Sequence, residues 1–329
     1  MGMRYRTLGA LGWNVSEIGY GMWGIAGGPG GFTGADYGTA PECLDLAVEL
    51  GCNFFDTAWA YGRGISERML GALLRRHPQR KLYVATKVPP KNMEWPPGPG
   101  DTLDDAYPPA HIREYTYKSL DNLGVDRIDL LQLHTWEDRW AKDEQWQESV
   151  RELKQEGVIG AAGISVNRWE PANCLAALST GLFEVIQVIY NIFDQSPEDE
   201  LLPRAQRDGI GVIARVPFDE GTLAGAVSLT STWPEGDWRN TYFGPENLGP
   251  SVAHLDELLA DVGDRMPLPE LALRFILANP AISTVIPGMR TLDHVRSNLA
   301  VSDGQALDGG LLTDLRRHRW DRVPAWWSG

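Results

Sequence analysis

Short apolar runs alternate with helical patterns along almost the whole chain. Eight of these runs are rich in Ile, Val, Leu and aromatic residues, which is typical of strands that are buried on both faces. They cover residues 16–21, 52–57, 81–87, 127–134, 158–165, 183–190, 209–216 and 282–287. Such strands belong to parallel sheets with helices on their faces. The pattern therefore predicts an α/β protein built around a parallel sheet.

The segments between these runs have the spacing of amphipathic helices. One of them begins with Pro41 and ends at Gly51, the asymmetry that is expected at helix ends. The other predicted helices cover residues 66–76, 109–124, 143–157, 169–181, 197–209, 268–280 and 291–300. Each predicted strand is thus followed by a helix.

Eight strands with eight following helices predict a (β/α)8 TIM barrel, which usually needs about 250 residues before extensions. The surplus in this 329-residue chain falls in four places. We expect an N-terminal hairpin in residues 1–15, long loops after strand three (88–108) and strand seven (217–251), and an extra C-terminal helix near 311–322. Composition shows no break, so we expect a single domain over residues 1–329. Active sites of barrels are built from the loops that follow the strands, and long loops often act as lids.

Composition and charge narrow the choice of partners. The formal net charge is −14 and the pI is about 4.9, which argues against binding to nucleic acid or to an anionic membrane. Apolar runs stay far below the roughly 20 residues of a membrane span. The first residues, MGMRYRTLG, contain no apolar signal core, so we expect a cytoplasmic protein.

The three cysteines, Cys43, Cys52 and Cys174, form no CxxC motif, and any pairing leaves one over. We expect reduced, small core residues at these positions, and we assign no metal site.

The segment GYGMWG at residues 19–24 matches the glycine pattern of dinucleotide-binding Rossmann folds. In that fold, however, the glycines open a helix at once. Here GIAGGPGGFTG continues as an expected loop. A glycine-rich loop that lets a ligand approach the backbone fits the pattern better.

Four polar residues follow apolar runs closely within one stretch of the chain: Asp56 after NFF, Tyr61 in AWAYG, Lys87 after LYVAT and His134 after IDLLQL. In a parallel barrel this placement brings them to one mouth, at the carboxyl ends of the strands. Lys87 paired with Asp56 can polarise the phenol of Tyr61, and His134 can orient a carbonyl oxygen. Together they can protonate a carbonyl oxygen while hydride reaches its carbon.

Each of these residues also has an ordinary structural explanation. Asp56 could cap the following turn, Lys87 could be a solvated strand end, and His134 could be a hydrogen-bonded core imidazole. Their joint occurrence at the ends of strands two, three and four favours the chemical interpretation.

These residues resemble the Asp–Tyr–Lys–His tetrad of the aldo-keto reductase superfamily. The similarity extends over nearly the whole chain, through the segments RTLGALGWNVSEIGYG, FFDTAWAYG, SERMLG, ATK, LQLH, GISVN, QVIYNIF and IPGMRTLDHVRSN. The resemblance implies a barrel that binds NADPH in an extended form. It also implies that Tyr61 is the general acid–base, polarised by Lys87 and Asp56, with His134 positioning the carbonyl.

The same resemblance implies where the cofactor binds. Ser165, Asn167 and Gln187 match the polar residues that hold the nicotinamide carboxamide, although Val166 separates the first two. The family often stacks an aromatic residue of strand seven on the nicotinamide, where this sequence has Arg215. A guanidinium can stack on a ring, but a cation there favours the neutral, reduced nicotinamide. The remaining implied cofactor residues are Gly21, Met22, Trp23, Leu223, Gly288, Arg290, His294 and Asn298.

Arg290 offers a charged fork to the 2′-phosphate of the adenosine, which favours NADP over NAD. His294 stands where relatives often carry Arg or Gln. It could face the adenine together with Asn298, because the two residues are four apart on a predicted helix.

The predicted loops around the tetrad carry Trp23, Trp59, Trp95 and Trp136, which we expect to contact a small-molecule carbonyl substrate. An apolar mouth suits aromatic or medium-length carbonyl compounds. Two alternatives stay open: an NAD-dependent aldose dehydrogenase on the same barrel, and a cofactor-sensing regulatory subunit without significant turnover.

Overall fold

The structure is a computed structural model that describes residues 2–27, 33–34 and 37–325. Eight parallel strands form one sheet in the order β10-β9-β8-β7-β6-β5-β4-β3. Bridges between Ile18 and Val285 and between Gly21 and Gly288 join its two edges into a barrel. The strands are β3 (Tyr20–Gly21), β4 (Phe54–Asp56), β5 (Tyr83–Val88), β6 (Ile128–Leu133), β7 (Ile159–Ser165), β8 (Val185–Ile189), β9 (Gly211–Arg215) and β10 (Thr284–Val285).

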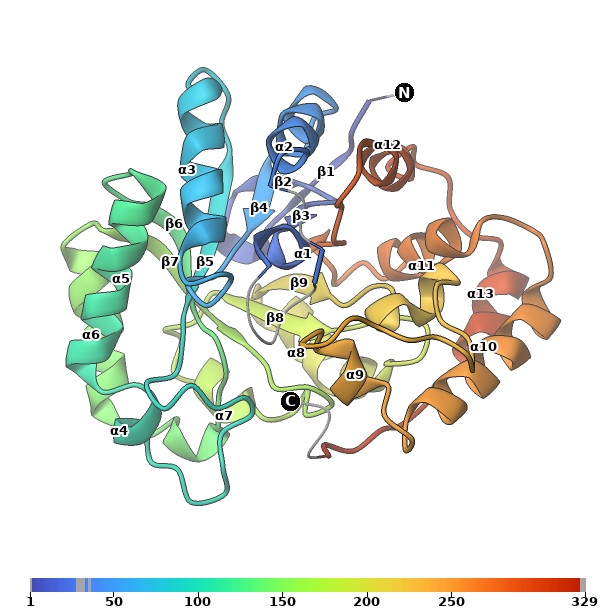
Figure 1. Ribbon diagram of the computed structural model, residues 1–329. Coiled ribbons are helices and arrows are strands. Elements are labelled where there is room, and N and C mark those ends of the chain that lie inside the picture. Colours follow the sequence, from blue (N-terminus) through green and yellow to red (C-terminus); the bar gives the residue numbers. More distant parts are fainter. Residues whose placement is uncertain (1, 28–32, 35–36, 326–329) are drawn as a thin grey trace.

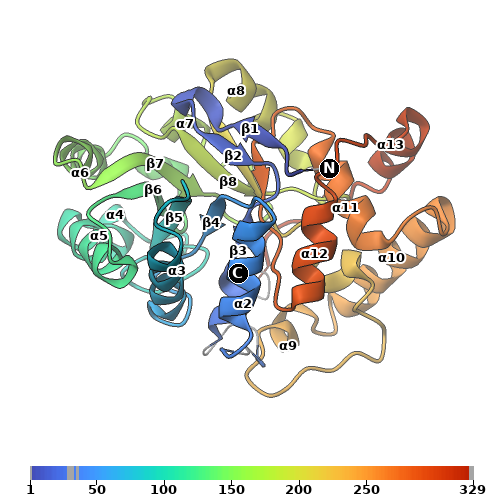
Figure 2. The same cartoon turned by 90° about the horizontal axis from the view of Figure 1, so that it is seen from above.

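Each strand is followed by a helix, and the helices form a ring around the strands when the molecule is seen from above (Figure 2). In chain order these helices are α2 (Ala40–Glu49), α3 (Ile65–Arg76), α5 (Pro109–Leu123), α6 (Glu144–Gln155), α7 (Leu175–Leu178), α8 (Leu201–Asp208), α11 (Leu268–Leu277) and α12 (Leu292–Ala300). The predicted (β/α)8 barrel is confirmed.

A hairpin of β1 (Tyr5–Thr7) and β2 (Asn14–Ser16) lies at the amino ends of the strands, as predicted. Its residues Leu8 and Val15 are fully buried against the lower barrel interior. A Cβ atom at Gly9 would lie 2.4 Å from the backbone nitrogen of Gly211, so only glycine allows this approach. The hairpin therefore closes the end of the barrel opposite to the expected active site.

The loops after β5 and β9 lie at the other end of the barrel, where α4 (Leu103–Ala106) and α9 (Arg239–Tyr242) are visible in the lower half of Figure 1. The predicted extra C-terminal helix is α13 (Gly309–Arg316). Cys43, Cys52 and Cys174 are buried and form no disulfide bond with one another. No helix in the described ranges has both the length and the hydropathy to cross a membrane.

The structure differs from the sequence prediction in two helices. The helix expected over residues 169–181 is reduced to the single turn of α7 (Leu175–Leu178). A long helix, α10 (Leu248–Val262), begins inside the segment that was predicted as loop 217–251. Its Gly249 and Pro250 suggest a loop, but proline is tolerated in the first turn of a helix.

The GYGMWG segment leads from β3 into α1 (Trp23–Ala26), a single helical turn, rather than into the long helix of a Rossmann fold. Part of the expected glycine-rich loop, residues 28–32 and 35–36, lies outside the described residues.

Candidate active site

The four predicted catalytic side chains meet at the carboxyl ends of neighbouring strands. Asp56 is the last residue of β4, Lys87 lies near the end of β5, and His134 directly follows β6. The Nζ atom of Lys87 is 2.6 Å from Oδ2 of Asp56 and 3.2 Å from the hydroxyl of Tyr61. The rings of Tyr61 and His134 meet edge to face with their centroids 5.6 Å apart. The structure thus brings the predicted tetrad together.

A tight turn after β4 holds Tyr61 in this position. Gly62 and Gly64 adopt φ values of +63° and +85°, which side chains other than glycine rarely allow. A Cβ atom at Gly62 would lie 2.8 Å from the carbonyl oxygen of Ala26. The Tyr61 carbonyl accepts from the N–H of Ser66 near the start of α3, which fixes the turn to that helix.

Lys87 and Asp56 form a buried ion pair whose charged atoms all have hydrogen-bond partners. The Lys87 side chain is fully buried and also donates to the backbone oxygen of Thr57 at 2.9 Å. The other carboxylate oxygen of Asp56 accepts from the side-chain amides of Gln187 at 2.7 Å and Gln132 at 3.3 Å. Burial opposes the charge of Lys87, but Asp56 outweighs it and raises the lysine pKa. Lys87 is therefore a cation at neutral pH.

Tyr61 is protonated at neutral pH. Burial raises the pKa of its phenol, and the Lys87 ammonium opposes this rise by favouring the phenolate. The same ammonium would stabilise negative charge on the oxygen once the proton leaves. These are the properties of a general acid that returns readily to its protonated form.

His134 is neutral at the same pH. Burial, together with the positive charges of Lys87 and Arg215, lowers the pKa of its imidazole well below the ordinary value. Its Nδ1 atom is buried and has no hydrogen-bond partner among the described residues. A neutral imidazole at this point can donate one hydrogen bond to a carbonyl oxygen.

Tyr61 and His134 line a cavity of about 710 Å³. Its wall carries four indoles, those of Trp23, Trp59, Trp95 and Trp238. Five residues of the wall hold a buried polar atom that lacks a hydrogen-bond partner within the described ranges: Trp95, His134, Arg168, Arg215 and Trp238. Buried polar groups usually have partners. A polar ligand in the cavity would supply them.

The cavity wall includes some of the residues expected to bind the nicotinamide, namely Trp23, Ser165, Asn167, Gln187 and Arg215. The side-chain amide of Asn167, however, is already occupied by the protein. Its oxygen accepts from the Thr135 hydroxyl at 2.5 Å, and its nitrogen donates to the Trp136 carbonyl at 2.7 Å. Asn167 therefore joins the loops after β6 and β7, and we leave it out of the proposed carboxamide site.

Gly21 and Gly288 lie where the barrel closes, and a Cβ atom at Gly21 would be 2.7 Å from a backbone oxygen. Met22 is fully buried, and its N–H donates to the carbonyl of Asp56. Leu223 is also fully buried, and its N–H donates to the carbonyl of Phe218. None of these residues is part of the cavity wall, so a role for them depends on a ligand that extends beyond it.

Arg290 lies outside the cavity wall, beside α1: a Cβ atom at Gly24 would be 3.3 Å from its Cδ atom. Its guanidinium donates to the Thr33 carbonyl at 3.4 Å. Thr33 in turn donates to Asp237 of the long loop after β9 through its N–H and its hydroxyl, at 2.9 and 2.8 Å. His294 is exposed on α12, whereas Asn298 on the same helix is buried.

Trp136 departs from the expectation that it contacts substrate. Its indole is fully buried, and its ring packs edge to face against Trp140, Trp146 and Phe183. The residue faces the helices instead of the mouth of the barrel, so we leave it out of the proposed substrate site. Trp238, from the long loop after β9, lies in the cavity wall, with its ring centroid 5.5 Å from that of Trp23.

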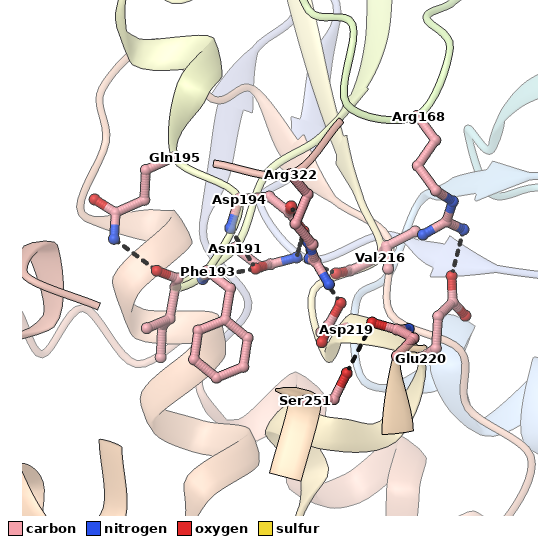
Figure 3. A network of polar contacts seen from close by, with 12 residues as sticks. Arg168, Asn191, Phe193, Asp194, Gln195, Val216, Asp219, Glu220, Ser251 and Arg322 are labelled. Atoms are coloured by element: carbon pink, nitrogen blue, oxygen red, sulfur yellow. Dashed lines mark hydrogen bonds and ion pairs between the residues drawn. The ribbon is translucent and has the colours of Figure 1, made fainter. Parts of the chain in front are cut away.

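The loop after β9 is held by a buried ion network that the sequence did not reveal (Figure 3). Arg322 of the C-terminal tail pairs with Asp194 after β8 at 2.5 Å and with Asp219 after β9 at 2.9 Å. Val216 has a φ of +56°, a strained value for a β-branched residue. Its carbonyl accepts from Asn191 at 3.0 Å. Strained backbone that is fixed from several sides is typical of binding loops.

Arg168 was also missed by the sequence analysis, although it lies just beyond the end of β7, directly after Asn167. It lines the cavity and pairs with Glu220 of the loop after β9 at 2.7 Å. Its position beyond a strand end was the signal that could have identified it.

The arrangement is a barrel with a cluster of polar side chains (Asp56, Tyr61, Lys87 and His134) beside a cavity at the carboxyl ends of its strands. A model of the aldo/keto reductase family matches residues 17–309. The uncharacterized oxidoreductase YqkF of Bacillus subtilis is 32% identical over 96% of this chain and 96% of its own. The NADH-specific methylglyoxal reductase of Escherichia coli is 30% identical over 91% of this chain and 93% of its own.

Among solved structures, the holo form of aldo-keto reductase AKR11C1 from Bacillus halodurans superposes with a TM-score of 0.77 and 29% identity. The alignment covers 99% of this chain and 100% of that one. The chain belongs to the aldo/keto reductase family and is an oxidoreductase of that family.

Proposed function

We propose that the protein reduces aldehydes or ketones to alcohols with NADPH and that Tyr61 donates the proton. The observation that carries this proposal is the contact between the Tyr61 hydroxyl and the buried Lys87 ammonium, at 3.2 Å, in the wall of a ligand-sized cavity. Family membership supports the reaction class. The proposal is tested by incubating the purified protein with simple aldehydes and ketones. We expect one reduced cofactor to be consumed for each alcohol formed.

In this mechanism the carbonyl oxygen of the substrate lies between the Tyr61 hydroxyl and the His134 imidazole. His134 donates a hydrogen bond to that oxygen and orients it. When bound, the reduced nicotinamide supplies the hydride that adds to the carbonyl carbon. Tyr61 transfers its proton to the oxygen, and the resulting phenolate is stabilised by Lys87 until solvent reprotonates it. Asp56 keeps Lys87 charged and fixed in place.

The residues around the tetrad fit a nicotinamide cofactor. Ser165 and the amide oxygen of Gln187 can hold the carboxamide, because the Gln187 nitrogen already donates to Asp56 and orients the side chain. The unpartnered Nε of Arg215 supplies a further donor at the same wall. Apolar and aromatic carbonyl compounds fit the indoles of Trp23, Trp59, Trp95 and Trp238.

The pH dependence follows from the two shifted groups. Because the pKa of Tyr61 is raised, we expect the rate of reduction to stay constant to about pH 9 and to fall only above the ordinary tyrosine range. Alcohol oxidation needs the phenolate of Tyr61, so the rate of oxidation should rise as the pH approaches the ordinary tyrosine range. His134 stays neutral, so neither profile should show a step near its ordinary pKa. Rates at saturating substrate across this range check the expectation, and a step near pH 6.5 that disappears in His134→Gln would contradict it.

Arg290→Ala tests the choice between NADPH and NADH. If Arg290 binds the 2′-phosphate, its loss should weaken NADPH binding by about ten- to a hundred-fold and NADH binding by less than about three-fold, the range of one charged hydrogen bond. Because one relative is NADH-specific, the reverse preference in the wild-type protein is the competing outcome. Equal losses for both cofactors would remove the assignment. Arg296→Ala, on the exposed face of α12, is the matched control.

A further inference from the structure

Among the described residues of the cavity wall, one partly buried cation has no ion-pair partner. The charged side chains of the described cavity wall are Arg63, Arg168 and Arg215. Arg168 is paired with Glu220, and Arg63 lies exposed. Behind the wall, the charges of Lys87 and Asp56 cancel within their ion pair. Arg215 forms no ion pair with any residue in the described ranges, so the site carries its positive charge inside the cavity.

Arg215 ends β9, and its Nη2 atom donates to the backbone oxygen of Val166 at 3.0 Å. That contact supplies no opposite charge. The two carboxylates that stabilise the guanidinium through space, Glu220 and Asp56, are each paired with another cation, Arg168 and Lys87. Burial and the nearby Arg168 lower the pKa of Arg215 to about 10, so the side chain is still a cation at neutral pH.

The charge of Arg215 acts on the catalytic groups themselves. It favours the phenolate form of Tyr61 and the neutral form of His134, and it is among the causes that set the pKa of each. Hydride has to reach a carbon whose oxygen contacts Tyr61 and His134. A nicotinamide that delivers the hydride must therefore lie in this same part of the cavity, within reach of the field of Arg215.

The nicotinamide ring is neutral when reduced and carries one positive charge when oxidised. We propose that Arg215 makes this site discriminate between the two oxidation states, so that the protein binds the reduced cofactor more tightly than the oxidised one. This inference rests on the proposed function, because it requires a nicotinamide at the tetrad. Two like charges a few ångströms apart in a protein site repel strongly enough to change affinity by about ten- to a hundred-fold.

The consequence for turnover has two parts. The protein is loaded with reduced cofactor and releases the oxidised form readily, which limits product inhibition during carbonyl reduction. The bound couple also becomes a weaker reductant, by about 30 mV for each ten-fold difference in affinity. Arg215 thus favours the replacement of oxidised by reduced cofactor. In return, the equilibrium of hydride transfer on the protein becomes less favourable to carbonyl reduction.

Equilibrium titration of tryptophan fluorescence tests the inference without any turnover, since four indoles line the cavity. Dissociation constants are measured for NADPH and NADP⁺, and in parallel for NADH and NAD⁺. The wild-type protein should bind each reduced form at least about ten-fold more tightly than its oxidised form. Arg215→Gln should bring the two within about three-fold, mainly by tightening the oxidised form, whereas Arg215→Lys should keep most of the difference.

Arg80→Gln is the matched control, because it removes one positive charge from an exposed site before β5, at the opposite end of the barrel. It should keep the wild-type ratio. Equal affinities of the wild-type protein for reduced and oxidised cofactor would overturn the inference. This measurement needs no variant, so it is decisive even if Arg215→Gln fails to fold. If a folded Arg215→Gln protein keeps the wild-type ratio of affinities for reduced and oxidised cofactor, then Arg215 serves only the contact with Val166. That result would overturn the inference too. A protein with the expected ratio but no carbonyl turnover would contradict only the proposed function.

Discussion

Replacing Tyr61 by phenylalanine should lower the rate of carbonyl reduction by about 10²- to 10⁴-fold, the usual contribution of a general acid. The variant keeps the ring that packs against Trp23 and His134 and loses only the hydroxyl beside Lys87. NADPH affinity should therefore stay within about three-fold, because the ring that shapes the wall is retained. Steady-state rates with a reactive aldehyde and a fluorescence titration of NADPH measure the two effects separately.

Tyr117→Phe is the matched control for this experiment. Tyr117 lies exposed on α5, where its hydroxyl donates to Glu156 at 2.9 Å, and it is not part of the cavity wall. Its loss should leave reduction unchanged. Full activity in a folded Tyr61→Phe protein would exclude the phenol as proton donor.

Lys87→Met should abolish most of the activity and also destabilise the protein. The variant leaves the carboxylate of Asp56, which is 2% exposed, without its cation. Breaking a buried ion pair by removing one partner usually costs about 3–5 kcal/mol. The free energy of unfolding from urea titration should fall by this amount, and the rate of reduction should fall by about 10²-fold or more because Tyr61 loses its polarising charge.

The double variant Asp56→Asn/Lys87→Met separates the two effects. Removing both charges relieves the uncompensated carboxylate, so the double variant should be more stable than Lys87→Met alone. Its activity should stay low, since the ammonium is still missing. Recovery of the activity together with the stability would show that Lys87 serves the fold and has no part in catalysis.

The strands and the tetrad could be predicted because both depend on local sequence. Buried parallel strands are nearly continuous apolar runs, and each of the eight predicted runs overlaps a strand of the barrel. Asp56, Lys87 and His134 directly end or follow these runs. Once a parallel barrel is assumed, its topology alone places their side chains at one mouth.

The remaining features depend on contacts between distant residues, which one sequence does not reveal. Arg322 bonds Asp194 and Asp219, which are 128 and 103 residues away along the chain. Trp136 and Asn167 also sit beyond strand ends, but packing against the helices buries Trp136, and hydrogen bonds to the neighbouring loop occupy Asn167. A position after a strand therefore indicates which end of the barrel a residue occupies. Its neighbours decide whether the side chain faces the cavity, as for Trp136, and whether its polar atoms are still available to a ligand, as for Asn167.

The most direct test of the account is a product measurement. The purified protein is incubated with NADPH and a panel of aldehydes and ketones that includes aromatic members, and the alcohol formed is counted against the cofactor oxidised. We expect one alcohol per NADPH consumed with at least one member of the panel, and no alcohol above background with Tyr61→Phe under the same conditions. Tight cofactor binding without any alcohol across the panel would contradict the central claim that this site reduces carbonyl compounds.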